Sequence, residues 1–206
     1  MDQPSGDGAW SRVAELLGDG SRILGPVTSG LLRADPGALA AVLARYKAVA
    51  KLAARDRSVL ELQCGEGLGA PILAETARAY LGVDTREAAI DAARTAFAGE
   101  RIAFRAATTL EEPWGCFDTV VWLDEISPGA GPPAPFRTLA ANLAPHGRFV
   151  LGFPRPDPER LAEFSALFQR VLPFSLAQGL LLPGHAPGAG YLLAVGCSPL
   201  PGAGAP

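Results

Sequence analysis

A glycine-rich turn after a strand-like segment is the part of this sequence from which ligand chemistry can be predicted first. Residues 59–63 read Val-Leu-Glu-Leu-Gln, and residues 65–70 read Gly-Glu-Gly-Leu-Gly-Ala. Glycines let the backbone approach a ligand closely, and the N-terminus of a following helix supplies free N–H donors. The spacing G-x-G-x-x-A therefore predicts a loop that holds a nucleotide-like cofactor.

Three carboxylates near this loop indicate which cofactor it holds. Asp84 ends the next predicted strand, where an acidic residue suits the hydroxyl pair of a ribose in either NAD or S-adenosylmethionine. Glu61 and Glu66 would repel a pyrophosphate but suit an ammonium and a sulfonium. The chain after Phe153 is also too short for a separate catalytic domain. S-adenosylmethionine is therefore favoured over NAD, and a dinucleotide-dependent oxidoreductase is the weaker alternative.

Strand-like and helix-like segments alternate along most of the chain. This alternation predicts a mostly parallel sheet with helices on both faces, and ligands of such sheets bind beyond the carboxyl ends of the strands. Gln63, Asp84 and Asp124 follow such ends, so we expect them to converge on one crevice. The predicted strands are 59–63, 80–84, 102–105, 117–123 and 149–153, followed by β-like runs at 174–182 and 190–197 that form an antiparallel hairpin. The predicted helices are 10–17, 36–55 with Asp35 as N-cap, 71–79, 86–97, 136–143 and 159–170.

Composition limits the classes of partner. The 206 residues suffice for one α/β domain, and the net charge of -3 predicts no contact with nucleic acid or with an anionic membrane. Apolar runs are too short to span a bilayer, and residues 1–7 do not resemble a signal peptide. Three cysteines fit neither a disulfide framework nor a metal site. We expect a cytoplasmic protein without a metal, and the oligomeric state is left open.

Four segments carry a family resemblance. They read V-L-E-L-x-C-G-x-G at 59–67, G-V-D at 82–84, F-D-T-V-V at 117–121 and L-x-P-x-G-R-F-V-L at 143–151. Together they resemble a class I S-adenosylmethionine-dependent methyltransferase over about residues 46–197. The resemblance implies a Rossmann-like, doubly wound α/β fold with a mostly parallel seven-stranded sheet and an antiparallel C-terminal hairpin. Residues 45–51 further resemble a bacterial group of small methyltransferases associated with surface-polysaccharide or secondary metabolism.

Composition and the extent of the resemblance together predict a division of the chain. Residues 35–198 would form the methyltransferase-like domain. Residues 1–34 would be an N-terminal segment that is partly disordered and includes a lid helix, and residues 199–206 would be a flexible tail. We expect the segment before Asp35 and the loop at 183–190 to shape the acceptor pocket.

The same resemblance implies roles for individual residues. Gly65 and Gly67 would pack on the methionine part of the cofactor, and Glu61 would orient its amino-acid end, directly or through water. Asp84 would accept from the ribose hydroxyls. On the adenosine side the implied neighbours are Thr85, Arg86 and the segment 106–110, which includes Thr108. Asp124 would touch cofactor or substrate, or equally cap the turn that follows it.

Several ligand-facing positions depart from the family pattern. Gln63 stands where the family has its first glycine, so its side chain would either project toward the cofactor or force a different backbone angle. No carboxylate occurs at Ala107 or Thr108 for the adenine, and residues 126–128 read Ile-Ser-Pro instead of an acidic-histidine pair. These departures support an alternative function, a non-catalytic partner or structural subunit with weakened or lost cofactor binding.

The first function predicted is methyl transfer to a small-molecule acceptor. Such a reaction depends mainly on aligning the acceptor with the methyl group, so it requires no universal catalytic residue. None is assigned in this sequence. His146 lies in a predicted turn, where it is more often a surface residue than a base. His185 lies in the hairpin loop, and a role as general base is the less favoured interpretation of it.

Overall fold

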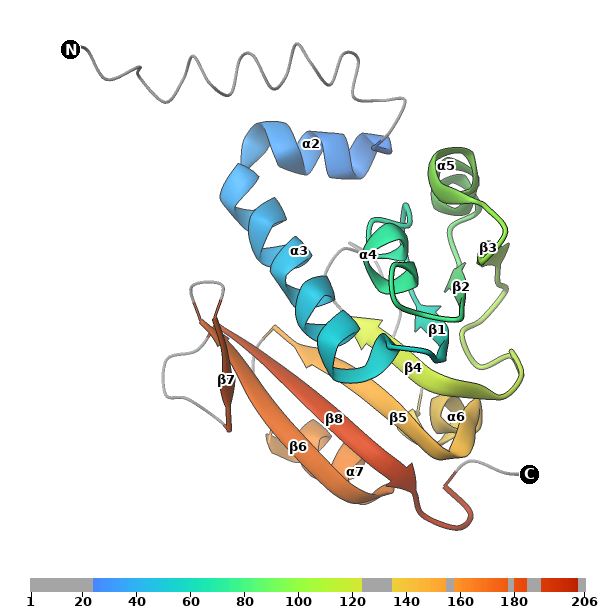
Figure 1. Ribbon diagram of the computed structural model, residues 1–206, viewed down its shortest axis with the longest axis vertical. Coiled ribbons are helices and arrows are strands. Elements are labelled where there is room, and N and C mark those ends of the chain that lie inside the picture. Colours follow the sequence, from blue (N-terminus) through green and yellow to red (C-terminus); the bar gives the residue numbers. More distant parts are fainter. Residues whose placement is uncertain (1–23, 124–134, 155–157, 178–179, 185–189, 204–206) are drawn as a thin grey trace, which may run out of the picture.

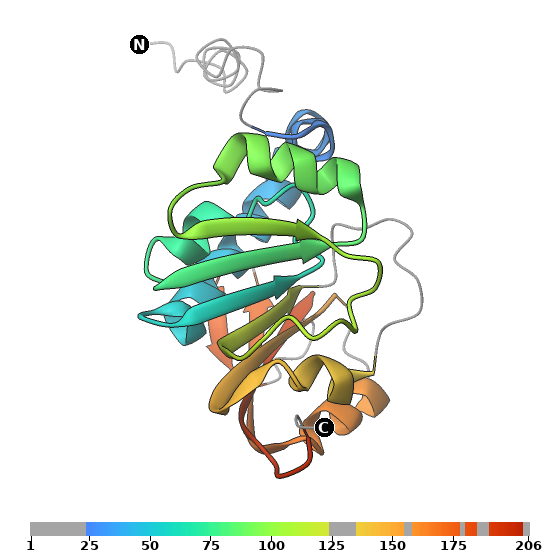
Figure 2. The ribbon, with the colours of Figure 1, turned by 90° about the vertical axis from the view of Figure 1, so that its right-hand side faces the viewer.

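The fold is a single eight-stranded sheet covered by helices on both faces (Figure 1, Figure 2). The computed structural model describes residues 24–123, 135–154, 158–177, 180–184 and 190–203. The strands are β1 (Ser58–Leu62), β2 (Ala79–Asp84), β3 (Ile102–Ala106), β4 (Phe117–Leu123), β5 (Leu143–Phe153), β6 (Phe168–Ala177), β7 (Leu180–Pro183) and β8 (Tyr191–Pro199). The helices are α2 (Pro26–Ala34), α3 (Pro36–Val49), the π-helical turn η2 (Ala50–Ala54), α4 (Ala70–Ala74), α5 (Glu87–Phe97), α6 (Phe136–Ala140) and α7 (Pro158–Ser165).

The strand order confirms the predicted fold class. It runs β3-β2-β1-β4-β5-β8-β6-β7, and the first five strands of this order are parallel. β8 lies between β5 and β6 and is antiparallel to both. Because β1, β2 and β4 run in the same direction side by side, their carboxyl ends lie at one edge of the sheet. Gln63 and Asp84 lie at this edge, as predicted, and Asp124 is outside the described residues.

The sheet has eight strands instead of the predicted seven. The single predicted run at 174–182 is wrong in detail, since residues 180–183 fold back as β7 and pair with the end of β6. β6 also begins at Phe168, inside the predicted helix 159–170. Pairing with β8 decides this, because Phe168 lies opposite Pro199 and its ring packs against Gly196. The apolar residues of 161–168 have helical spacing, but helix α7 ends at Ser165.

Two other predicted helices are shorter than expected. The helix predicted at 71–79 is the five-residue α4, and the helix predicted at 136–143 ends at Ala140. Leu143 already belongs to β5, where it pairs with Phe117. In the second case the pairing of a strand ended a segment that local periodicity would have continued.

The long helix before the first strand begins as predicted. The Asp35 carboxylate accepts a hydrogen bond from the Ala38 N–H at 2.9 Å, which confirms the N-cap. The predicted segment 36–55 nevertheless changes from α-helix to a π-helical turn at Ala50. Two side chains from the sheet use carbonyls of that turn: Thr119 donates to Ala53 and Arg148 donates to Leu52. These contacts fix how α3 enters β1.

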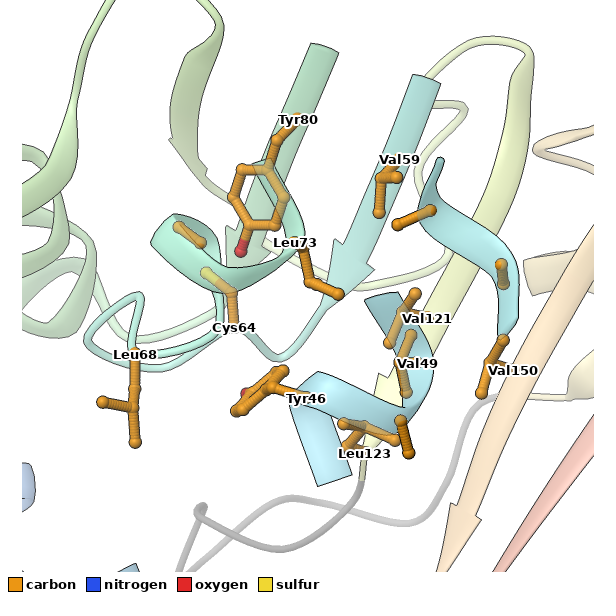
Figure 3. Packing of buried hydrophobic residues seen from close by; sticks show 14 of the residues in the cluster. Tyr46, Val49, Val59, Cys64, Leu68, Leu73, Tyr80, Val121, Leu123 and Val150 are labelled. Carbon is orange, nitrogen blue, oxygen red and sulfur yellow. The ribbon is translucent and has the colours of Figure 1, made fainter. Parts of the chain in front are cut away.

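Each face of the sheet has its own core. Helices α3, α4 and α5 pack on one face, which includes Tyr46, Leu73 and Tyr80 (Figure 3). Helices α6 and α7 pack on the other face around an aromatic cluster of Phe136, Phe149, Phe164 and Phe168. Successive residues of a strand point to opposite faces. Glu61 therefore points to the face with α3, and its neighbours Leu60 and Leu62 point to the face with α6.

Some predictions fall on residues outside the described ranges. These are the helix at 10–17, Asp124, the segment 126–128 and His185. Ala203, in the predicted tail, is buried against the face of the sheet that carries α6. Within the described ranges, every helix is too short or too polar to cross a membrane.

Candidate cofactor site

The loop between β1 and α4 is a tight turn with three left-handed residues. Gln63, Gly65 and Gly67 have φ values of 55°, 58° and 76°. A Cβ atom on Gly67 would lie 2.9 Å from the Phe104 ring, so packing against β3 requires this glycine. A Cβ atom on Gly65 would have as its nearest neighbour the Arg86 guanidinium, at 3.5 Å. Gly67 thus lets the loop pack on the sheet, whereas Gly65 presents its backbone toward Arg86.

Gln63 has a left-handed backbone conformation, and its side chain bonds a neighbouring strand. Its side-chain oxygen accepts a hydrogen bond from the indole N–H of Trp122 at 2.6 Å. Trp122 lies on the neighbouring strand β4 and is almost fully buried. The Gln63 amide is therefore tied to the next strand, and its predicted contact with a cofactor stays a prediction.

Asp84 joins the ends of β1 and β2. Its side chain is 2% exposed. Oδ2 accepts from the Gly65 N–H at 2.8 Å, and Oδ1 accepts from the Arg86 N–H at 2.9 Å. The Arg86 guanidinium adds two bonds, from Nε to Oδ1 at 3.1 Å and from Nη2 to Oδ2 at 3.2 Å. A buried carboxylate thus lies directly beside the glycine loop.

Glu61 is buried between the sheet and α3, with 1% of its surface exposed. Its two oxygens accept from the hydroxyls of Tyr46 at 2.7 Å and Tyr80 at 2.5 Å. Figure 3 shows both tyrosines in the same core layer as Cys64. Burial raises the pKa of Glu61 to about 7, although the two tyrosine hydrogen bonds oppose this rise. Its predicted role toward the cofactor stays a prediction, and the structure gives it two protein partners.

Glu66 holds the N-terminus of α2. Its oxygens accept from the backbone N–H groups of Val27 at 2.9 Å and Thr28 at 2.8 Å. A carboxylate in this position is favoured by the unpaired N–H groups and by the helix dipole. From the sequence, the negative charge of Glu66 was expected to repel a phosphate-bearing ligand. In the structure this charge is directed to α2, so it bears less on the choice of cofactor than expected.

The Glu112 carboxylate binds the backbone of the segment that was predicted to lie along the adenine. Its Oε1 accepts from the N–H groups of Thr108 at 2.8 Å and Thr109 at 3.3 Å, just after β3. Sequence reasoning looked for an acidic residue at 107–108 and missed Glu112. The T-x-x-E spacing of residues 109–112 is the signal that could have found it. Thr85 and Thr108 are both exposed at this edge of the sheet.

Comparison with known proteins finds a similarity over part of the chain. Residues 59–147 match the model of a methyltransferase domain family. This span contains the glycine loop, Asp84 and strands β1 to β4. This part of the chain is therefore similar to a methyltransferase domain, and the chain has the fold of solved S-adenosylmethionine-dependent methyltransferases. No curated protein sequence matches the chain.

Solved methyltransferase structures share the fold of this chain at low sequence identity. A TehB-like S-adenosylmethionine-dependent methyltransferase from Corynebacterium glutamicum is 22% identical with a TM-score of 0.60, over 82% of this chain and 93% of that one. The N-methyltransferase NodS from Bradyrhizobium japonicum, in complex with S-adenosyl-L-homocysteine, is 16% identical with a TM-score of 0.54, over 84% and 98%. The T. thermophilus 16S rRNA methyltransferase RsmC, in complex with AdoMet and guanosine, is 19% identical with a TM-score of 0.55, over 80% and 43%.

The residues around the glycine loop fit S-adenosylmethionine chemically. Asp84 is an acceptor of the kind that a ribose hydroxyl pair needs, and it is fixed by the Gly65 N–H. Gly65 suits its positive φ and leaves the space in front of the Arg86 guanidinium without a side chain. One feature limits the fit, because the Arg86 guanidinium is bonded to both Asp84 oxygens.

Proposed function

We propose that this domain binds S-adenosylmethionine at the carboxyl ends of β1 and β2 and transfers its methyl group to a small-molecule acceptor. The observation that carries the proposal is the buried Asp84 carboxylate, hydrogen-bonded to the Gly65 N–H beside the glycine loop. An acidic residue at the end of the second strand, linked to a glycine turn after the first, suits a nucleoside.

The chain's own residues would bind and orient rather than react. When bound, the cofactor supplies an electrophilic methyl group on a sulfonium sulfur. Asp84 would accept from the ribose hydroxyls and the Gly65 backbone would lie along the methionine part. Thr85 and Thr108 would flank the adenosine, and Asp124 is proposed as a further contact. Because alignment supplies most of the rate enhancement, no residue is assigned as general base.

Charge supports a small molecule as the acceptor. The chain has 18 Lys and Arg against 21 Asp and Glu, whereas a surface that binds nucleic acid needs an excess of positive charge. The fold alone does not determine the class of methyl acceptor, because RsmC is a 16S rRNA methyltransferase and NodS is an N-methyltransferase.

Calorimetric titration tests cofactor binding. We expect micromolar binding of S-adenosylhomocysteine and no binding of NADH. Asp84→Asn should weaken S-adenosylhomocysteine binding at least tenfold. The control Asp118→Asn should not, since Asp118 lies at the start of β4 and bonds Ser58 and Arg78. Tight NADH binding would overturn the assignment.

A labelling experiment tests the acceptor. The protein is incubated with methyl-labelled S-adenosylmethionine and separate fractions of small metabolites, RNA and protein. We expect label in the metabolite fraction, and transfer to RNA or protein instead would contradict the proposal.

A non-catalytic role is the second candidate function. Two observations favour it: Gln63 replaces a glycine at a left-handed position, and Arg86 is bonded to both oxygens of Asp84. If the folded protein binds no S-adenosylhomocysteine, this second function is supported.

A further inference from the structure

Hydrogen bonds fill the acceptor positions of Asp84. A carboxylate offers about two lone pairs on each oxygen. Oδ1 accepts from the backbone N–H and the Nε–H of Arg86, and Oδ2 accepts from the Gly65 N–H and the Arg86 Nη2. Each oxygen therefore has one bond from backbone and one bond from the Arg86 guanidinium.

The two kinds of bond differ in how easily they can be exchanged. The backbone bonds belong to the loop after β1 and the start of α5, so breaking them would distort the fold. The Arg86 guanidinium is on a flexible side chain that is 35% exposed. It can leave by rotation about side-chain torsions without moving either strand. The positions that can be vacated are thus the two that the guanidinium holds, one on each oxygen.

A ribose hydroxyl pair needs two acceptor positions of this kind. Its two neighbouring hydroxyls donate side by side, as the Nε–H and Nη2–H of a guanidinium do. The guanidinium also lies 3.5 Å from the point where a Gly65 Cβ would be, which is the open side of the glycine loop. It occupies the place that a nucleoside bound to Asp84 would take.

We propose that Arg86 is a displaceable occupant of the ribose position, and that its departure from Asp84 accompanies cofactor binding and sets the affinity. This inference rests on the proposed function. The displaced Arg86 guanidinium would move toward Glu66. The Glu66 carboxylate is held in place by the N-terminus of α2 and interacts favourably with the positive charge of Arg86. While the guanidinium stays on Asp84, only the fraction of molecules without that contact can bind, which lowers the apparent affinity.

Substitution of Arg86 tests the inference by S-adenosylhomocysteine titration. Arg86→Met keeps an unbranched apolar side chain and removes the guanidinium. We expect it to bind S-adenosylhomocysteine at least threefold more tightly than the parent. The matched control is Arg78→Met, because Arg78 pairs with Asp118 near the amino end of the strands. That control should leave the dissociation constant unchanged. Equal or weaker binding by Arg86→Met overturns the inference.

A second comparison identifies the ribose as the competitor. Adenosine and 2′,3′-dideoxyadenosine are used to displace S-adenosylhomocysteine from each protein. The gain of Arg86→Met should appear with adenosine and be absent with the dideoxy compound. An equal gain with both would overturn the assignment of the ribose position.

A measurement on the unsubstituted protein covers the case in which Arg86→Met does not fold. The Arg86 Nε–H resonance, assigned from its loss in Arg86→Lys, should exchange slowly in free protein and rapidly with S-adenosylhomocysteine bound. Slow exchange in the complex would overturn the inference. If the folded parent and both variants bind no S-adenosylhomocysteine, the proposed function fails and the inference fails with it. If parent and Arg86→Met bind equally, the inference alone fails.

Discussion

At the scale of the residue, Gln63 after β1 has an unfavourable backbone conformation and a favourable side-chain hydrogen bond. A left-handed conformation costs a non-glycine residue roughly 1–2 kcal/mol. Its hydrogen bond to Trp122 offsets part of this cost, because an unpartnered indole N–H inside the protein is itself unfavourable. A glycine at this position would avoid the strain but leave Trp122 without this acceptor. The glutamine therefore makes a contact with the next strand that a glycine could not make.

Two substitutions separate the backbone strain of Gln63 from its hydrogen bond to Trp122. Both Gln63→Ala and Gln63→Gly lose the bond to Trp122, but only the alanine keeps the left-handed strain. We expect Gln63→Gly to be more stable than Gln63→Ala by about 1 kcal/mol in urea unfolding. Equal stability of the two variants would show that the backbone angle costs nothing at this position.

At the scale of the element, α2 is attached to the cofactor loop through one side chain. Glu66 lies in the glycine turn, and its carboxylate accepts the N–H groups of Val27 and Thr28. A Cβ on Gly25 would overlap the Glu66 carboxylate, so the chain before α2 also packs closely on it. Helix α2, which was not predicted from the sequence, is thereby connected to the loop that is proposed to bind the cofactor.

Removal of this carboxylate should release α2. In Glu66→Ala we expect the amides of residues 26–34 to lose at least tenfold of their protection from hydrogen exchange, because the N-terminus of the helix loses its acceptors. Asp35→Ala is the control, since it removes the N-cap of α3 and leaves Glu66 in place. Unchanged protection of α2 in Glu66→Ala would contradict its attachment through this residue.

At the scale of the whole molecule, Glu61 makes stability depend on pH. It is enclosed by Tyr46 from α3 and Tyr80 from β2, and Asp84 and Cys64 lie close enough to interact electrostatically. Burial raises its pKa from 4.5 to about 7, so the folded protein keeps a proton that the unfolded chain releases. The free energy of unfolding contributed by Glu61 is therefore fully present below about pH 4.5 and falls as pH rises through about 7.

Glu61→Gln should flatten this dependence. Between pH 5 and pH 8 the parent should lose up to about 3 kcal/mol of unfolding free energy more than the variant. Glu75→Gln is the control, because Glu75 is an exposed glutamate at the end of α4. Denaturant unfolding at a series of pH values measures the effect, and parallel curves for parent and Glu61→Gln would refute it.

The sequence by itself determined the order of the elements and much of the site's composition. Strand 117–123 and the Asp35 cap were predicted to the residue, because β-branched runs and short-range capping act locally. Gly65, Gly67 and Asp84 could be picked out because a tight turn and a strand-end carboxylate leave a local pattern.

Only the tertiary structure decided how these residues pair. The division of 174–182 into β6 and β7 depends on pairing with strands distant in sequence. The Glu61 bonds to Tyr46 and Tyr80, the cap that Glu66 gives α2 and the bond from Gln63 to Trp122 join segments up to 59 residues apart. Local periodicity carries no information on such contacts, because they form only when the sheet brings separate segments together. The glycine turn could thus be predicted as a ligand loop, but the presence of Arg86 on Asp84 could be seen only in the fold.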